Sequence, residues 1–196
     1  MDVSGGAAAA RVVELINTRD CQNGDDLLAD DRAQSWLRGW LSDAGGDASG
    51  DAGSGASVDA RRLAELRALR EGLRELAAGN NARAGDAETV RRAAAVLRAV
   101  PVAVELGDDQ TGPFLVARQA GEFAERAVVA LAGTYLTARA SGAWSRVKAC
   151  ASPDCRWGYL DGSRNRSRRW CDMAECGNRA KNRAWRERNV VTGDAS

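Results

Sequence analysis

The chain has 196 residues, 44% hydrophobic and 28% charged, which is the composition of a globular protein and excludes wholesale disorder. Its length suits one ordinary domain with a small module, or two small domains. No apolar run approaches the roughly 18 residues of a membrane span, and the first residues lack the basic region of a signal peptide. We therefore expect a cytoplasmic protein with no membrane partner, whose cysteines stay reduced.

The periodicity of apolar residues predicts helices along most of the chain. In order, they cover about residues 8–19, 33–41, 57–77, 86–100 and 118–140. Ser57 or Asp59 can cap the third helix and Asp86 the fourth, which Pro101 ends. Their Leu and Trp stripes are typical of faces that pack in a core.

Two other segments of the first 142 residues are not helical in pattern. Residues about 43–57 are Gly, Ser, Asp and Ala without periodicity, which predicts a flexible loop. Alternating apolar residues at 102–106 and a second apolar run at 114–116 predict a short β-hairpin. The chain contains no His, no nucleophile beside a base and no glycine-rich phosphate loop, so we expect no enzyme.

Four of the five cysteines form two pairs near the C-terminus. Cys150 and Cys155 are followed, after fifteen residues, by Cys171 and Cys176, so each pair has a four-residue spacer. This spacing suits one closed tetrahedral zinc site with a structural role. Disulfides, a redox pair and an iron–sulfur centre are the alternatives, and a reducing cytoplasm and the spacer length disfavour them. The isolated Cys21 is expected to be a small buried hydrophobic residue.

The sequence around these cysteines predicts a hairpin and a helix. Residues 156–160 and 168–171 are the expected strands, joined by a turn at 161–163, and residues 178–188 are the expected helix. So small a module has little core of its own, and metal binding supplies roughly 10–16 kcal/mol in comparable zinc domains.

Positive charge is concentrated in this part of the chain. Residues 146–188 hold twelve Arg or Lys and five Asp or Glu, although the whole chain has a net charge of only +1. Such an asymmetry predicts an end that faces a polyanion. The candidate nucleic-acid contacts are Arg164, Arg166, Arg168 and Arg169 in the loop, and Arg179, Lys181, Asn182, Arg183 and Arg186 in the helix.

The chemistry of these residues divides them by role. Loop arginines bind phosphate oxygens in a fork, whereas Arg and Asn on an exposed helical face can bond guanine and adenine edges in the major groove. A competing interpretation is a solvated surface that balances the negative charge of a four-thiolate metal site. The aromatic residues of the module could stack on bases, but most are expected in its core.

The motifs resemble those of a known family. The strings Cys150-Ala-Ser-Pro-Asp-Cys155, Asp161-Gly-Ser-Arg-Asn-Arg-Ser-Arg-Arg-Trp-Cys171 and Cys176-Gly-Asn-Arg-Ala-Lys181 resemble the CGNR zinc finger. In that family the finger follows a mostly helical domain called ABATE, in bacterial proteins regarded as stress-induced transcription regulators. The segment Glu14-Leu-Ile-Asn-Thr18 is similar to a motif near the start of that domain, with Glu for Asp and Leu for Phe. The resemblance implies four zinc ligands and DNA binding.

The sequence thus predicts a mostly α protein. A helical ABATE-like domain with a short β-hairpin spans residues 1–142, a zinc-binding β-hairpin and helix module spans 143–190, and a disordered tail spans 191–196. The expected function is a transcription regulator that holds one structural Zn²⁺ and binds double-stranded DNA. An RNA-binding protein or a protein-interaction module in a stress response is the alternative. A small-molecule effector of the N-terminal domain and a homodimer are further expectations.

Overall fold

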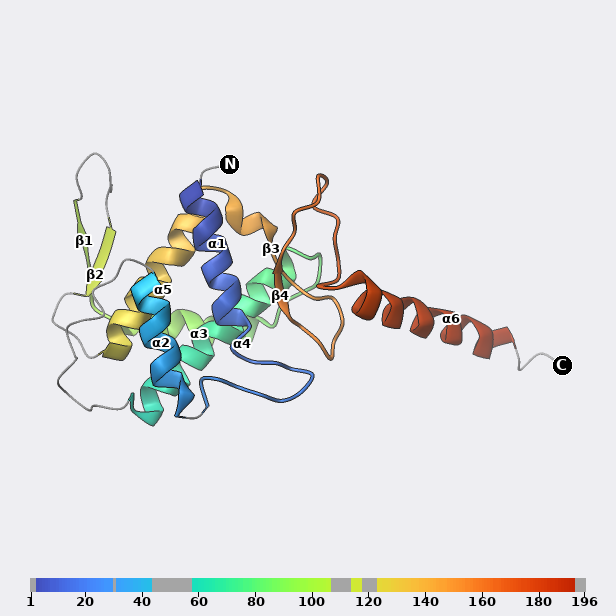
Figure 1. Ribbon diagram of the computed structural model, residues 1–196, viewed down its shortest axis with the longest axis horizontal. Helices are drawn as coiled ribbons and strands as arrows, with labels where there is room; N and C mark the ends of the chain where they lie inside the picture. The colour runs from blue at the N-terminus through green and yellow to red at the C-terminus, as the bar shows by residue number, and fades with distance from the viewer. Residues whose placement is uncertain (1–2, 30, 44–57, 107–113, 118–122, 193–196) are drawn as a thin grey trace.

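The computed structural model describes residues 3–29, 31–43, 58–106, 114–117 and 123–192 (Figure 1). Five helices form a helical body: α1 (Val3–Ile16), α2 (Arg32–Asp43), α3 (Ala60–Gly79), α4 (Ala87–Ala99) and α5 (Phe123–Ala140). The mostly α architecture expected from the sequence is therefore confirmed. Among the described helices, none combines the length and apolar character that crossing a membrane requires.

Side-chain caps fix the starts of two of these helices. Asp59 accepts a hydrogen bond from the backbone N–H of Arg62 at the start of α3, and Asp86 accepts from those of Glu88 and Thr89 at the start of α4. Such caps satisfy backbone donors that have no partner within the helix. Both starts agree with the sequence prediction.

The helices enclose one apolar core. It contains most of the predicted stripes, including Val12, Leu15 and Ile16 of α1 and Leu66 and Leu69 of α3, whereas Leu76 and Leu97, also predicted to face the core, are 37% and 38% exposed. The first helix begins at Val3, five residues before the predicted start. It packs closely there, since a Cβ on Gly5 would lie 2.1 Å from Ser141 Oγ. The loop predicted at about 43–57 lies outside the described residues from position 44 onward.

The predicted short hairpin is present. Strand β1 (Val102–Glu105) pairs antiparallel with β2 (Phe114–Ala117), with Val102 opposite Ala117. In Figure 1 this hairpin stands at the opposite end of the molecule from the C-terminus.

Residues 143–192 form a second unit, here called the C-terminal module. It contains a 3₁₀ turn, η2 (Ala143–Arg146), strands β3 (Val147–Ala149) and β4 (Gly158–Leu160), a single π-helical turn, η3 (Met173–Gly177), and helix α6 (Asn178–Thr192). Helix α6 projects away from the rest of the molecule (Figure 1). It continues to Thr192, so the disordered tail predicted from residue 191 is wrong for its first two positions.

The strand pairing in this module differs from the prediction. Strand β4 pairs antiparallel with β3, with Ala149 opposite Gly158, and not with residues 168–171. The segment at 168–171 has no strand geometry, although the carbonyl of Arg169 accepts a hydrogen bond from the N–H of Ala151. The first cysteine pair therefore occupies the turn of the β3–β4 hairpin.

The β3–β4 hairpin packs directly on the helical body. Trp144, Val147 and Ala149 belong to the same apolar core as α1 and α3. Strand β4 approaches α1 so closely that a Cβ on Gly158 would lie 2.9 Å from Ile16 Cγ2. The predicted boundary at residue 142 thus falls at a turn, but the two units share one hydrophobic interior.

Candidate zinc centre and the basic surface beside it

Three short elements bring the four cysteines together. Cys150 directly follows β3, Cys155 lies in the following turn, Cys171 precedes the π-helical turn, and Cys176 lies within it. The N–H of Cys150 donates to the carbonyl of Trp157 at 2.8 Å, which closes the hairpin around the first pair.

The cysteine sulfurs have the spacing of a tetrahedral metal site. All four Sγ atoms lie within 4.8 Å of one another, with 3.5 Å between Cys155 and Cys171 and 3.7 Å between Cys171 and Cys176. Tetrahedral coordination with Zn–S bonds of about 2.3 Å requires sulfurs about 3.8 Å apart. The donor set therefore fits Zn²⁺, as predicted.

The electrostatics of the thiols also favour a bound cation. Burial raises the pKa of the Cys155 thiol to about 12, and burial with neighbouring thiols raises that of Cys171 well above its usual range. Burial also raises the pKa of Cys176, but hydrogen bonds from Arg179 and the neighbouring thiols together outweigh it, and the net direction is downward. Clustered thiolates need a compensating charge, which Zn²⁺ supplies when it binds.

A buried ion pair shapes the arginine-rich loop at 161–169. Lys148 Nζ donates to Asp161 Oδ2 at 2.7 Å and to the carbonyls of Arg166 and Arg168 at 2.5 and 3.1 Å. Asp161 also accepts hydrogen bonds from the N–H and hydroxyl of Ser163. Both charged side chains are almost fully buried, so they fix the loop from inside.

Several of the predicted nucleic-acid residues have protein partners. Arg166 donates to Ser145 Oγ at 2.8 Å, and Arg168 donates to the carbonyls of Trp170 and Cys171. Two helix residues do likewise. Arg179 donates to Gln22 Oε1 at 2.7 Å and Cys176 Sγ at 3.0 Å, and Arg183 lies 3.4 Å from Asp154 Oδ2.

The remaining predicted residues are exposed. Within the described part of the chain, no hydrogen bond or ion pair engages the side chains of Arg164, Arg169, Lys181, Asn182 or Arg186. Arg169 lies over the ring of Trp170, with 5.5 Å from its guanidinium carbon to the ring centroid. Trp185 is 60% exposed, whereas Tyr159 is buried and Trp157 and Trp170 pack beside the cysteines.

Helix α6 consequently has two different faces. Arg179, Ala180, Arg183 and Ala184 line a groove that the first cysteine turn completes with Ala151 and Pro153. At 100° per residue, Trp185 lies opposite that groove, Asn182 lies beside Trp185, and Arg186 lies at the edge between Asn182 and Arg179. The predicted arginine stripe is thus divided between the groove and solvent.

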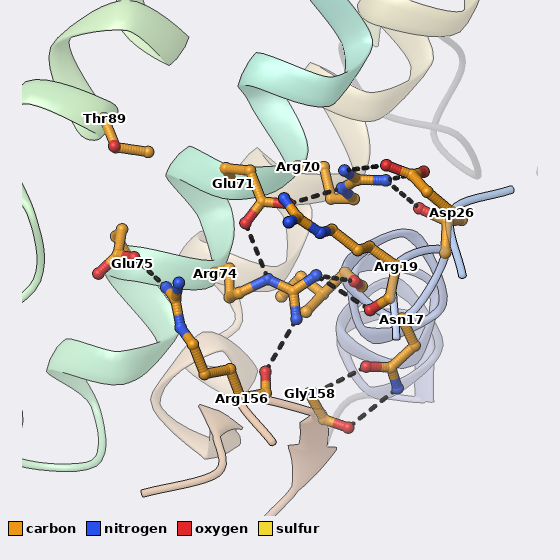
Figure 2. Close-up of polar contacts among 12 residues, drawn as sticks. Asn17, Arg19, Asp26, Arg70, Glu71, Arg74, Glu75, Thr89, Arg156 and Gly158 are labelled. Atoms are coloured by element: carbon orange, nitrogen blue, oxygen red, sulfur yellow. Dashed lines mark hydrogen bonds and ion pairs between the residues drawn. The ribbon is translucent and has the colours of Figure 1, made fainter. Parts of the chain in front are cut away.

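A polar cluster joins the module to α1 and α3 (Figure 2). Asn17 donates to the carbonyl of Gly158 at 3.0 Å and accepts from its N–H at 2.7 Å. Arg74, fully buried on α3, donates to the carbonyls of Arg156 and Ile16 at 2.9 and 2.7 Å. An ion pair between Arg156 and Glu75 lies beside these contacts.

Two asparagines directly after α3 form a second set of hydrogen bonds to the C-terminal module. Asn80 donates to the carbonyls of Trp144 and Val147, and Asn81 to those of Ala149 and Arg169, all within 2.9 Å. The supporting residues missed at the sequence level are Asn17, Arg74, Asn80, Asn81, Lys148 and Asp161. Only the similarity of the Glu14–Thr18 segment to a family motif pointed to one of them, Asn17.

Comparison with known families agrees with this architecture. Residues 9–147 match the ABATE family, described as "Putative stress-induced transcription regulator", and residues 146–189 match the CGNR zinc finger. No curated protein matches the chain. Because the first match covers more than half of the sequence and the second contains all four clustered cysteines, the chain belongs to the ABATE family and carries a CGNR zinc finger.

Proposed function

We propose that this protein is a cytoplasmic transcription regulator that binds double-stranded DNA through its zinc finger. The observation that carries the proposal is α6, a basic helix that projects from the body (Figure 1) and carries exposed Lys181, Asn182, Trp185 and Arg186. Its 15 residues correspond to a length of about 22 Å at about 1.5 Å per residue. A helix of this kind fits the major groove, which is about 12 Å wide.

The face of α6 away from the groove is the proposed reading surface. Asn182, Trp185 and Arg186 are exposed there at positions i, i+3 and i+4. Asn and Arg side chains pair with the adenine and guanine edges respectively, and an exposed Trp can pack against a base or sugar. Arg179 and Arg183 then serve chiefly to position the helix through their protein partners.

The loop arginines are the proposed phosphate contacts. Arg164 and Arg169 extend from the loop that Lys148 and Asp161 hold, and Lys181 adds a charge on α6. In this proposal Arg166 and Arg168 mainly stabilise the loop, because their guanidinium groups already bond to protein oxygens. Phosphate contacts of this type fix the register of a protein on DNA without reading its sequence.

The metal has a structural role in this proposal. Four thiolates complete a tetrahedral Zn²⁺ site and leave no open position for a substrate, so we propose one structural ion and no enzymatic activity. The helical body is the proposed regulatory part, which responds to a small-molecule effector or forms a homodimer. A bacterial stress response is the setting that the family suggests.

The test is DNA binding by the zinc-loaded full chain on fragments of its own genome at several salt concentrations. Each phosphate neutralised contributes about −0.9 to the slope of log affinity against log salt. Replacing Arg164 and Arg169 by Ala should flatten that slope by about 1.8 units for all fragments. Replacing Asn182 and Arg186 should instead remove the preference for selected fragments. Arg92→Ala with Arg98→Ala, both exposed on α4, is the control with the same change in charge as the loop pair, and Arg98→Ala alone is the control for the helix pair.

Other outcomes would contradict the proposal. Tighter binding to structured RNA than to duplex DNA would make the protein an RNA binder. A flat salt dependence with no selected fragments would assign the basic surface to an acidic protein partner instead.

A further inference from the structure

Two adjoining cavities open at the surface of the helical body. The first, about 210 Å³, is lined by α3, α4 and α5, and the second, about 240 Å³, lies between α4, α5 and the start of β1. They share three lining residues, Leu97, Ala132 and Tyr135. The two cavities therefore lie side by side, with these three side chains between them.

The lining of both cavities is apolar. Leu, Val, Ala and Gly residues make up the walls, and the hydroxyl of Tyr135 is the single polar side-chain group among the lining residues. An apolar cavity of about 150 Å³ stays dry and binds benzene. The wall chemistry admits an uncharged apolar molecule and leaves a charged one without a partner.

Close helix contact prevents this space from collapsing. A Cβ on Gly72 of α3 would lie 2.2 Å from Ala93 Cβ of α4, so these helices already touch at their smallest residues. Protein interiors are normally packed to the density of organic crystals, and unfilled apolar volume costs stability. The rim is accessible, since Leu97 is 38% and Leu136 52% exposed.

The cavity wall contacts the C-terminal module directly. The ring of Tyr135 packs edge-on against Trp144, with centroids 4.9 Å apart and planes at 86°. Trp144 lies in η2, immediately before β3, and its carbonyl accepts the hydrogen bond from Asn80. A molecule that displaces Tyr135 would therefore move the segment that leads to the cysteines.

Helix α3 makes a second connection. Leu69 and Leu73 line the first cavity, while Arg70 and Arg74 of the same helix take part in the polar cluster of Figure 2. One helix thus contacts the cavity on one side and the zinc finger on the other. Two contiguous routes join these parts of the protein.

We propose that the two cavities bind a small uncharged apolar molecule, of the size of one aromatic ring or a short alkyl chain with at most one hydroxyl group. Its binding alters the zinc finger through Tyr135, Trp144 and α3. A change in DNA affinity on binding follows only if the proposed function holds. Binding of the molecule and its effect on the zinc finger do not depend on that function.

Binding is tested by calorimetric titration of the zinc-loaded full chain with toluene, phenol and 1-octanol. Ala94→Leu and Ala132→Leu each place a larger side chain in the cavity wall, and Ala95→Leu, exposed on α4, is the matched control. At least one probe should bind to the wild type and to the control. The same probe should bind at least tenfold more weakly to both filled variants. Circular dichroism and zinc content establish that each variant is folded. No binding of any probe to the wild type, or equal binding to the folded filled variants, would overturn the proposal.

The effect on the finger is tested without DNA, by the rate of zinc release to a chelator. A bound probe should change that rate at least twofold in the wild type and the control. An unchanged rate would overturn the effector role. A probe-dependent rate in a protein that fails to bind DNA would instead contradict the proposed function alone.

Discussion

Replacement of Lys148 by Met should destabilise the zinc-loaded protein strongly. The ammonium group of Lys148 donates to Asp161 and to two loop carbonyls, and the two charged side chains are 4% and 0% exposed. Methionine has a similar length but no charge, so Asp161 is left as a buried carboxylate without its counterion. Removing one partner of a buried pair typically costs about 3–5 kcal/mol. We expect a loss near the upper end, because two carbonyls also lose their donor.

The assay is urea unfolding of wild type and variant, each loaded with zinc, at pH 7. For a denaturant slope of about 2 kcal/mol per molar, a loss of about 4 kcal/mol lowers the unfolding midpoint by about 2 M. Lys181 is the other lysine of the chain and is exposed on α6, so Lys181→Met is the matched control. It should change the unfolding free energy by less than about 0.5 kcal/mol.

The result that refutes this reasoning is a loss below about 1 kcal/mol for Lys148→Met, the range of an exposed ion pair. The arginine-rich loop would then be held by other contacts.

Three further predictions concern the helical body and the metal. Burial raises the pKa of Asp26, but the hydrogen bonds and charge of buried Arg70, the N–H of Leu28 and the charge of Arg19 together lower it more, so its pKa is below the usual value. The Asp26–Arg70 ion pair therefore stabilises the fold above the unfolded pKa of about 4, and this stabilisation is lost as the pH falls through the lower folded pKa. Asp26→Asn should cost roughly 2–4 kcal/mol of unfolding free energy at pH 7. The difference from wild type in urea unfolding should shrink between pH 5 and pH 3, and a constant difference would contradict the ion pair. Asn17→Ala leaves the N–H and carbonyl of Gly158 without the side chain that pairs them and should cost roughly 1–3 kcal/mol of stability, measured by thermal unfolding. Asn23→Ala, at an exposed position, is the control and should cost close to nothing. Equal losses in the two variants would contradict the contact. Chelation of zinc at neutral pH should shift tryptophan emission to longer wavelength while most far-UV helical signal persists, and added zinc should restore it; an unchanged emission would argue against a structural ion.

The features that the sequence predicted well depend on short spacings. Apolar residues three and four positions apart identified the core faces of the helices, and the caps at Asp59 and Asp86 marked two starts. The cysteine spacing alone identified the four clustered thiols. In each case the residues that signal the structure are close in the chain, so no knowledge of the fold was needed.

The features that were missed depend on contacts between distant segments. Strand β3 is three residues long, too short for its alternation to be distinguished from chance, so its pairing with β4 is not visible in the sequence, which favours residues 168–171 instead. Arg74 looks like a surface residue by composition, yet its partners, Ile16 and Arg156, lie 58 and 82 positions away. Burial of such a charge follows from the fold, because only the assembled backbone supplies enough acceptors.

The shared interior of the body and the zinc finger limits how such a finger can be exchanged in evolution or by engineering. A chimaera that received only residues from about 143 onward would bring the apolar side chains of Trp144 and Val147 without the surface that covers them. It would also lack Asn80 and Asn81, which hold four finger carbonyls. Recombination between members of this family should therefore conserve the pairing of α3 with its own finger, and new DNA preferences should arise by substitutions on the solvent face of α6.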